Sequence, residues 1–192
     1  MKIGSSNSPP NIFNHLFPHN TSNTRSICAL TMDNDLACAQ YVVITQPPTL
    51  TAGKITPKAL MLFEQNCLDY FINAKGGVAD NLKVPRILSS FKDIEVLDWI
   101  ASDRERLQGI TFPAFMTELR RNFLPLDWEE TICSEILSSK LTSNKSFQDW
   151  ARIQVINNCV LQGTTSHFSN NNLQNTLEAN HCETKQVGKL HS

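Results

Sequence analysis

The residues of this chain that could carry chemistry are a few carboxylates, imidazoles and thiols. Asp103 and Glu105 lie two positions apart, and Glu129 and Glu130 are adjacent. Paired carboxylates in different surroundings are the usual equipment for general acid–base hydrolysis. Both pairs, however, fall in segments of helical pattern, where acidic residues commonly form a solvated face or sit at the positive end of the helix dipole. We therefore predict no catalytic residue, and a small hydrolase or nuclease is the least favoured alternative.

The histidines and cysteines do not predict a metal site. All 5 histidines lie in polar segments or near the chain ends. His181 and Cys182 are adjacent, but two neighbouring ligands do not complete a tetrahedral site. The 6 cysteines include no Cys-x-x-Cys pair, so we interpret them as separate thiols, with Cys67 and Cys133 on apolar helix faces. Since the common nucleotide-binding and hydrolase motifs are also missing, we expect no cofactor, no metal and no enzymatic activity.

Charge and composition argue against several further classes. A net charge of −1 over 192 residues does not provide the basic surface that sequence-independent nucleic-acid binding needs, so RNA is expected only as an indirect partner. No apolar run of about eighteen residues predicts a membrane span, and the N-terminus lacks the pattern of a secretory signal. We therefore expect no membrane partner, a cytoplasmic location and reduced thiols rather than disulfides.

Helical periodicity defines the elements that must position these residues. The clearest pattern lies between Thr111 and Glu130, where apolar residues recur at steps of three and four on one stripe. Thr111 is a suitable N-cap for a first helix, and a second helix should open at Asp127, with Glu130 completing a capping box. The stripe of the first helix consists of Phe112, Phe115, Met116, Leu119 and Phe123.

Five further helices are expected from the same kind of pattern. Pro85 leaves the start of one of them open: a start near Asn81 puts the proline past the first turn and kinks the helix, whereas a start at Val84 makes it a favourable first residue. The next helix, capped by Asp93, should continue unbroken to about Leu107. The approximate ranges are 57–74, 80–91, 94–107, 146–162 and 170–180.

Two segments lack such a pattern. Residues 1–54 are rich in Ser, Asn, Thr and Pro and predict a disordered leader. A short strand or a transient helix around Tyr41 to Ile44 is the one element considered there. Residues 183–192 predict a disordered tail, and because no long alternating pattern occurs, the fold class predicted is all-α.

Bulky residues at helical spacing are the candidates for structure and assembly. Aromatic side chains spaced in this way could line a ligand groove, but core packing explains them more simply, because their burial supplies much of the available stabilisation. We select Trp99, Phe115, Leu119, Phe123, Trp128, Phe147 and Trp150.

The order of short motifs along the chain resembles the capsid region of Gag proteins from gypsy-type LTR retrotransposons. Each motif is weak alone, and the likeness lies in their order and spacing. The motifs are Ile55-Thr56-Pro57, Val96-x-x-Trp99, Asp103-Arg104-x-Arg106-Leu107, Phe115-x-x-x-Leu119-Arg120-x-x-Phe123-Leu124-Pro125, Trp128-Glu129, Ser146-Phe147-x-x-Trp150, Leu161-x-Gly163-Thr164-x-Ser166-His167 and Leu177-Glu178-Ala179-Asn180.

This resemblance implies two small helical lobes of retroviral-capsid type, at 55–125 and 126–182, the second of them truncated. It implies a non-enzymatic structural protein that acts by self-association. Its partners would be copies of itself, other Gag chains, or a short peptide held in a groove. A domesticated helical interaction adaptor is the alternative, and loss of all function is a further one.

Overall fold

The computed structural model describes residues 35–142 and 146–187, with side chains of the last helix described as far as residue 180. Helices dominate this part of the chain, and the all-α prediction is confirmed. None of the helices described combines the length and the apolar character needed to cross a bilayer. The elements are β1 (Ala39–Gln40), β2 (Thr49–Leu50), α1 (Pro57–Asn73), α2 (Asp80–Ile87), η3 (Leu88–Ser90), α3 (Ile94–Ser102), α4 (Arg104–Gly109), α5 (Phe112–Phe123), α6 (Trp128–Ser138), α7 (Phe147–Val160) and α8 (Asn170–Val187).

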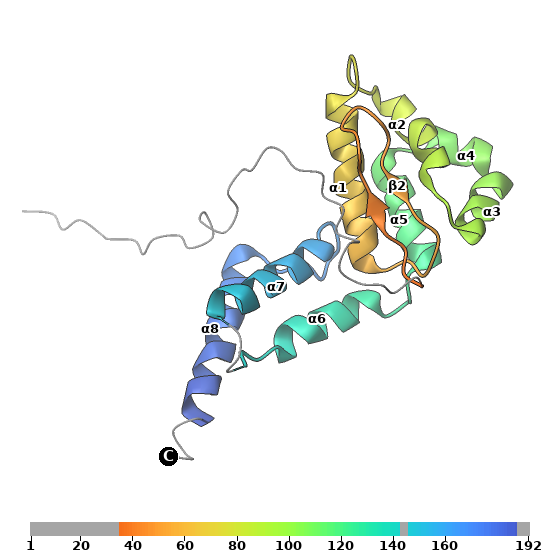
Figure 1. Ribbon diagram of the computed structural model, residues 1–192. Helices are drawn as coiled ribbons and strands as arrows, with labels where there is room; N and C mark the ends of the chain where they lie inside the picture. Colours follow the sequence, from red (N-terminus) through yellow and green to blue (C-terminus); the bar gives the residue numbers. More distant parts are fainter. Residues whose placement is uncertain (1–34, 143–145, 188–192) are drawn as a thin grey trace, which may run out of the picture.

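The helices gather around two hydrophobic cores. The first core is enclosed by α1 to α5 and the β1–β2 hairpin, with Phe63, Phe91 and Phe115 buried at its centre. The second lies between α6, α7 and α8, around Ile136 and Leu173. Figure 1 shows these as two bodies joined through the short connection between α5 and α6.

Helix α1 begins and ends where its sequence indicates. The Thr56 hydroxyl accepts a hydrogen bond from the Ala59 amide at 3.1 Å, and Pro57 occupies the first turn, where a missing N–H costs nothing. At the other end, Gly76 and Gly77 adopt φ values of 81° and 70°, a region that favours glycine. The predicted helix over 57–74 is confirmed to within one residue.

Residues 35–54 are ordered, so the prediction of a disordered leader is wrong over this stretch. β1 and β2 pair as an antiparallel hairpin on α1, and the buried Leu50 accepts a hydrogen bond from the Lys92 amide at 3.0 Å. Gly53 has φ of 120°, and a Cβ there would lie 2.9 Å from the carbonyl oxygen of Asp35. Two-residue strands are too short to produce a visible alternation, which is why the sequence pattern missed them.

The strand or helix considered at Tyr41 to Ile44 is also wrong, because this stretch connects the two strands.

One of the cysteines that the structure describes differs from the prediction. Cys38 is disulfide-bonded, whereas Cys67, Cys133 and Cys159 are free thiols. The expectation of reduced thiols is therefore wrong at Cys38, because it came from an assumed compartment and not from the placement of the thiols. The rest of the predicted leader, residues 1–34, lies outside the described residues.

The helix predicted between 94 and 107 is divided in two. Asp103 adopts φ of −133° and ψ of 24°, which interrupts the helical hydrogen bonds between α3 and α4. The hydroxyl of Ser102 donates to the Trp99 carbonyl at 2.8 Å, a back-bond that competes with the helix at this point. In α2, the helix starts at Asp80, so Pro85 lies inside it, and after Ile87 the chain continues as η3.

The helix starts in the second half of the chain are predicted with mixed success. The hydroxyl of Ser146 accepts from the Asp149 amide at 3.1 Å, as an N-cap should. Asp127 occupies the N-cap position of α6 but makes no side-chain capping bond, so the predicted capping box with Glu130 is wrong. Helix α8 continues to Val187. The predicted tail is therefore helical over 183–187, and 188–192 lie outside the described residues.

Candidate interaction surfaces

The seven selected residues lie in the two hydrophobic cores, against them, or at the connection between them, and Phe147 is partly exposed. Phe115 and Leu119 are fully buried in the first core, and Trp150 is buried in the second. Trp99 and Phe123 are partly buried against the first core. These residues pack helices together, and none of the buried ones is available to a partner.

Trp99 connects α3 to α5 through two ring contacts. Its ring centroid lies 5.8 Å from that of Phe115 and 5.5 Å from that of Phe123, the latter in an edge-on arrangement. Phe115 continues the cluster to Phe91 at 6.0 Å. Such edge-on and tilted pairs stabilise beyond their buried area, so this aromatic cluster holds α3 against the lobe despite the break at Asp103.

Trp128 lies at the joint between the two cores. It packs against both of them, and its amide donates to the Pro125 carbonyl at 3.2 Å, which closes the turn between α5 and α6. Beyond the joint, the Trp150 indole donates to the Ser139 hydroxyl at 2.8 Å. Phe147 contacts the Trp150 ring at a centroid distance of 5.7 Å and remains 38% exposed.

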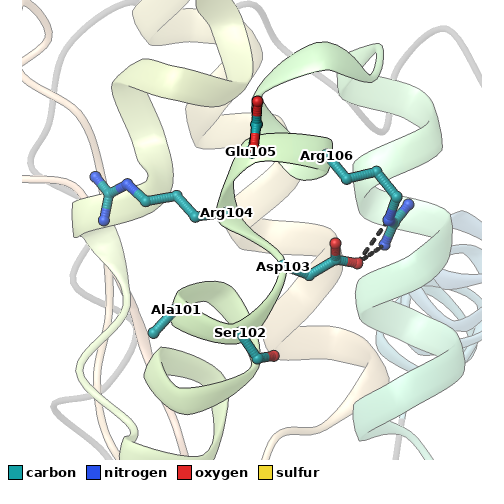
Figure 2. Close-up of a pocket in the computed structure, with 6 residues that line it drawn as sticks. All are labelled: Ala101, Ser102, Asp103, Arg104, Glu105 and Arg106. Carbon is teal, nitrogen blue, oxygen red and sulfur yellow. Dashed lines mark hydrogen bonds and ion pairs between the residues drawn. The ribbon is translucent and has the colours of Figure 1, made fainter.

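The carboxylates do not converge on one point. Arg106 binds Asp103 at 2.5 Å and forms a two-pronged pair with Glu118, with both nitrogen–oxygen distances at 2.7 Å. Glu105 points away from the Asp103–Arg106 pair (Figure 2). Glu129 accepts a hydrogen bond from the Ser166 hydroxyl at 3.0 Å. Asp103, Glu118 and Glu129 are therefore each bound to another side chain.

The pair between Arg106 and Glu118 is also visible in their electrostatics. The guanidinium, by hydrogen bonding and by charge, lowers the pKa of Glu118, and the Glu118 and Asp103 carboxylates raise the pKa of Arg106 in turn. Across the part of the chain that the structure describes, no cluster of three or more His, Cys, Asp or Glu residues is arranged to hold a metal ion. The ion pair between Arg106 and Glu118 connects α4 to α5.

An apolar hollow with basic residues at its edge lies beside α3. Its volume is about 480 Å³, and we call it the basic-rimmed hollow. Lys92 and Arg104 are the cationic members of its lining, and both are exposed. The other lining residues are Leu88, Ser89, Phe91, Leu97, Ile100 and Ala101.

A second, more polar hollow of about 660 Å³ adjoins it at the break between α3 and α4. The two share Ala101 and Arg104. Figure 2 shows the Arg104 side chain extending away from the Asp103–Arg106 pair. The basic-rimmed hollow was not predicted from the sequence. In the unbroken helix that we predicted, the four- and three-residue steps between Leu97, Ala101 and Arg104 would have placed them on one face.

A fully exposed leucine stands at the joint between the lobes. Leu126 has a relative exposure of 103%, and it is followed by Asp127 and Glu130, whose side chains are also exposed. We call these three residues the acidic knob. An isolated exposed apolar residue is common on protein surfaces, but here it lies in the turn that the hydrogen bond from the Trp128 amide closes.

No protein-family model, curated protein or solved structure matches this chain. The assignment of function must therefore come from the sequence motifs and from the geometry described above.

Proposed function

We propose that this chain is a Gag-like structural protein, resembling the capsid region of gypsy-type retrotransposons, that acts by self-association. The observation that carries the proposal is the arrangement of two small helical cores joined at Trp128, with apolar side chains left exposed on both lobes. The order of Gag-like motifs along the chain supports the same assignment.

The exposed apolar residues favour an interaction role. Val42 is 76% exposed in the hairpin, Ile72 78% in α1 and Ile94 72% in α3, and Leu126 is fully exposed at the joint. Large apolar residues that remain in water lower the free energy when they are buried against a partner. Assemblies built from many copies need only modest interfaces of this kind, because each copy uses several.

The proposal is tested by measuring the mass of the purified protein as its concentration rises. We expect light scattering to report species above the 21.6 kDa monomer, and negative-stain electron microscopy to show discrete oligomers or short assemblies. A strict monomer at every protein and salt concentration would contradict the proposal.

A helical interaction adaptor is the second candidate. The basic-rimmed hollow favours it, because an apolar floor with two cations at the edge is suited to a short acidic peptide. A monomeric protein that binds one such peptide with a stoichiometry of one would support the adaptor over the assembling protein.

A further inference from the structure

We infer that the acidic knob of one copy docks into the basic-rimmed hollow of a second copy. This inference rests on the proposed function and names the two surfaces that would carry self-association. Leu126 would enter the apolar floor around Leu97 and Ile100, and the flanking Asp127 and Glu130 would meet Lys92 and Arg104 at the rim.

The two carboxylates of the knob lie at the start of α6, and no side chain among the described residues binds them. Asp127 makes no capping bond to α6, and neither its carboxylate nor that of Glu130 has a hydrogen bond or ion pair with another residue in the described ranges. By contrast, the neighbouring Glu129 binds Ser166. The knob therefore presents two carboxylates beside one exposed leucine.

The basic-rimmed hollow complements the acidic knob both in charge and in apolar character. Lys92 reaches only the carbonyl of Ser89, at 3.4 Å, and neither Lys92 nor Arg104 pairs with a carboxylate among the residues that the structure describes. Phe91 and Ile100 are almost fully buried, and Leu97 is 38% exposed. The lining thus offers an apolar floor for one leucine and two cations for two anions.

The contact has to form between molecules. Leu126 is not among the residues that line the hollow, and it is fully exposed, so none of the residues that the structure describes covers it. Because knob and hollow are different surfaces, each docking event leaves one of each free. Interfaces of this head-to-tail kind generate rings when they close and filaments when they do not.

The rim pairs are exposed to solvent, so the association should weaken as salt increases. Two charge-reversal variants test the pairing. Lys92→Glu/Arg104→Glu makes the hollow acidic, and Asp127→Lys/Glu130→Lys makes the knob basic. Far-UV circular dichroism and thermal unfolding establish that each variant is folded. We expect this because all four side chains are exposed, and the loss of negative charge at the start of α6 should lower Tm only slightly.

We expect each variant alone to associate at least about tenfold more weakly than the unchanged protein, the equivalent of about 1.4 kcal/mol. An equimolar mixture should recover association, because the acidic hollow of one then faces the basic knob of the other. Leu126→Ser should also weaken association, while Leu68→Ser, at a position on α1 that is 45% exposed and lies outside both the knob and the hollow, should not.

The outcomes separate this inference from the proposed function. If the unchanged protein associates but both variants associate equally well, or if the mixture stays dissociated, the knob and hollow are not the interface and the proposed function stands. If the unchanged protein is monomeric throughout, both are wrong.

Discussion

The side chain of Asn158 and the backbone of Phe168 form a reciprocal pair of hydrogen bonds in the second lobe. The Asn158 amide nitrogen donates to the Phe168 carbonyl at 3.0 Å, and its oxygen accepts from the Phe168 amide at 2.8 Å. Asn158 is 4% exposed. Its side chain bonds both backbone groups of Phe168 and so closes the loop between α7 and α8.

Replacing Asn158 with Ala should destabilise the second lobe by about 1 to 3 kcal/mol, since the backbone groups of Phe168 lose their partners in a partly buried setting. Chemical denaturation followed by far-UV circular dichroism measures this loss. Asn157→Ala, a half-exposed neighbour on the same helix, is the matched control and should change stability little. Equal effects of the two substitutions would contradict the role assigned to Asn158.

Phe115→Ala should destabilise the first lobe by about 3 to 5 kcal/mol, because it removes a fully buried ring and leaves a cavity. The Phe115 ring contacts the rings of Phe91 and Trp99, so its removal should also weaken the packing of α3 against the first core. Trp fluorescence during denaturation would report this, with Ile72→Ala, which is 78% exposed, as the control. A loss below about 1 kcal/mol for Phe115→Ala would show that the cluster is not the centre of the lobe.

The pair between Arg106 and Glu118 predicts a specific pH dependence. The pKa of Glu118 is lowered from its ordinary value of 4.5 in the folded state, so its contribution is present above that pH and is lost as the pH falls through the folded pKa. Arg106→Gln should therefore lower Tm at neutral pH, and the difference from the unchanged protein should shrink as the pH falls below about 4.5. Arg86→Gln, an exposed arginine on α2, should show no such convergence.

The free cysteines report the two lobes separately. Cys67 is fully buried, and burial raises the pKa of its thiol well above the ordinary range, so alkylation should be slow in the folded protein. Burial also raises the pKa of Cys159, which is only partly buried. In the Asn158→Ala variant, mass spectrometry should find faster labelling of Cys159 and unchanged labelling of Cys67. Equal acceleration at both would mean that the lobes unfold together.

Helices whose ends are marked by local chemistry could be predicted from the sequence. Thr56 and Pro57 define the start of α1, Thr111 defines the start of α5, and Ser146 defines that of α7. Each signal depends on a hydrogen bond between residues three apart, so no knowledge of tertiary contacts is needed.

Features that depend on distant partners could not be predicted in this way. The hairpin at 35–54 is held by bonds such as that from the Gly53 amide to the Asp93 carboxylate at 3.2 Å, across 40 positions of sequence. The break at Asp103 accompanies a pair with Arg106, which also binds Glu118 on another helix. Likewise, the basic-rimmed hollow combines residues from η3, α3 and α4, and no single helical pattern contains them all.

Sedimentation velocity across a wide range of protein concentrations tests the central claim of self-association most directly. We predict that the sedimentation coefficient rises with concentration at low salt and falls towards that of a 21.6 kDa monomer as salt is added. A single coefficient, unchanged by concentration and by salt and equal to that of the monomer, would contradict it.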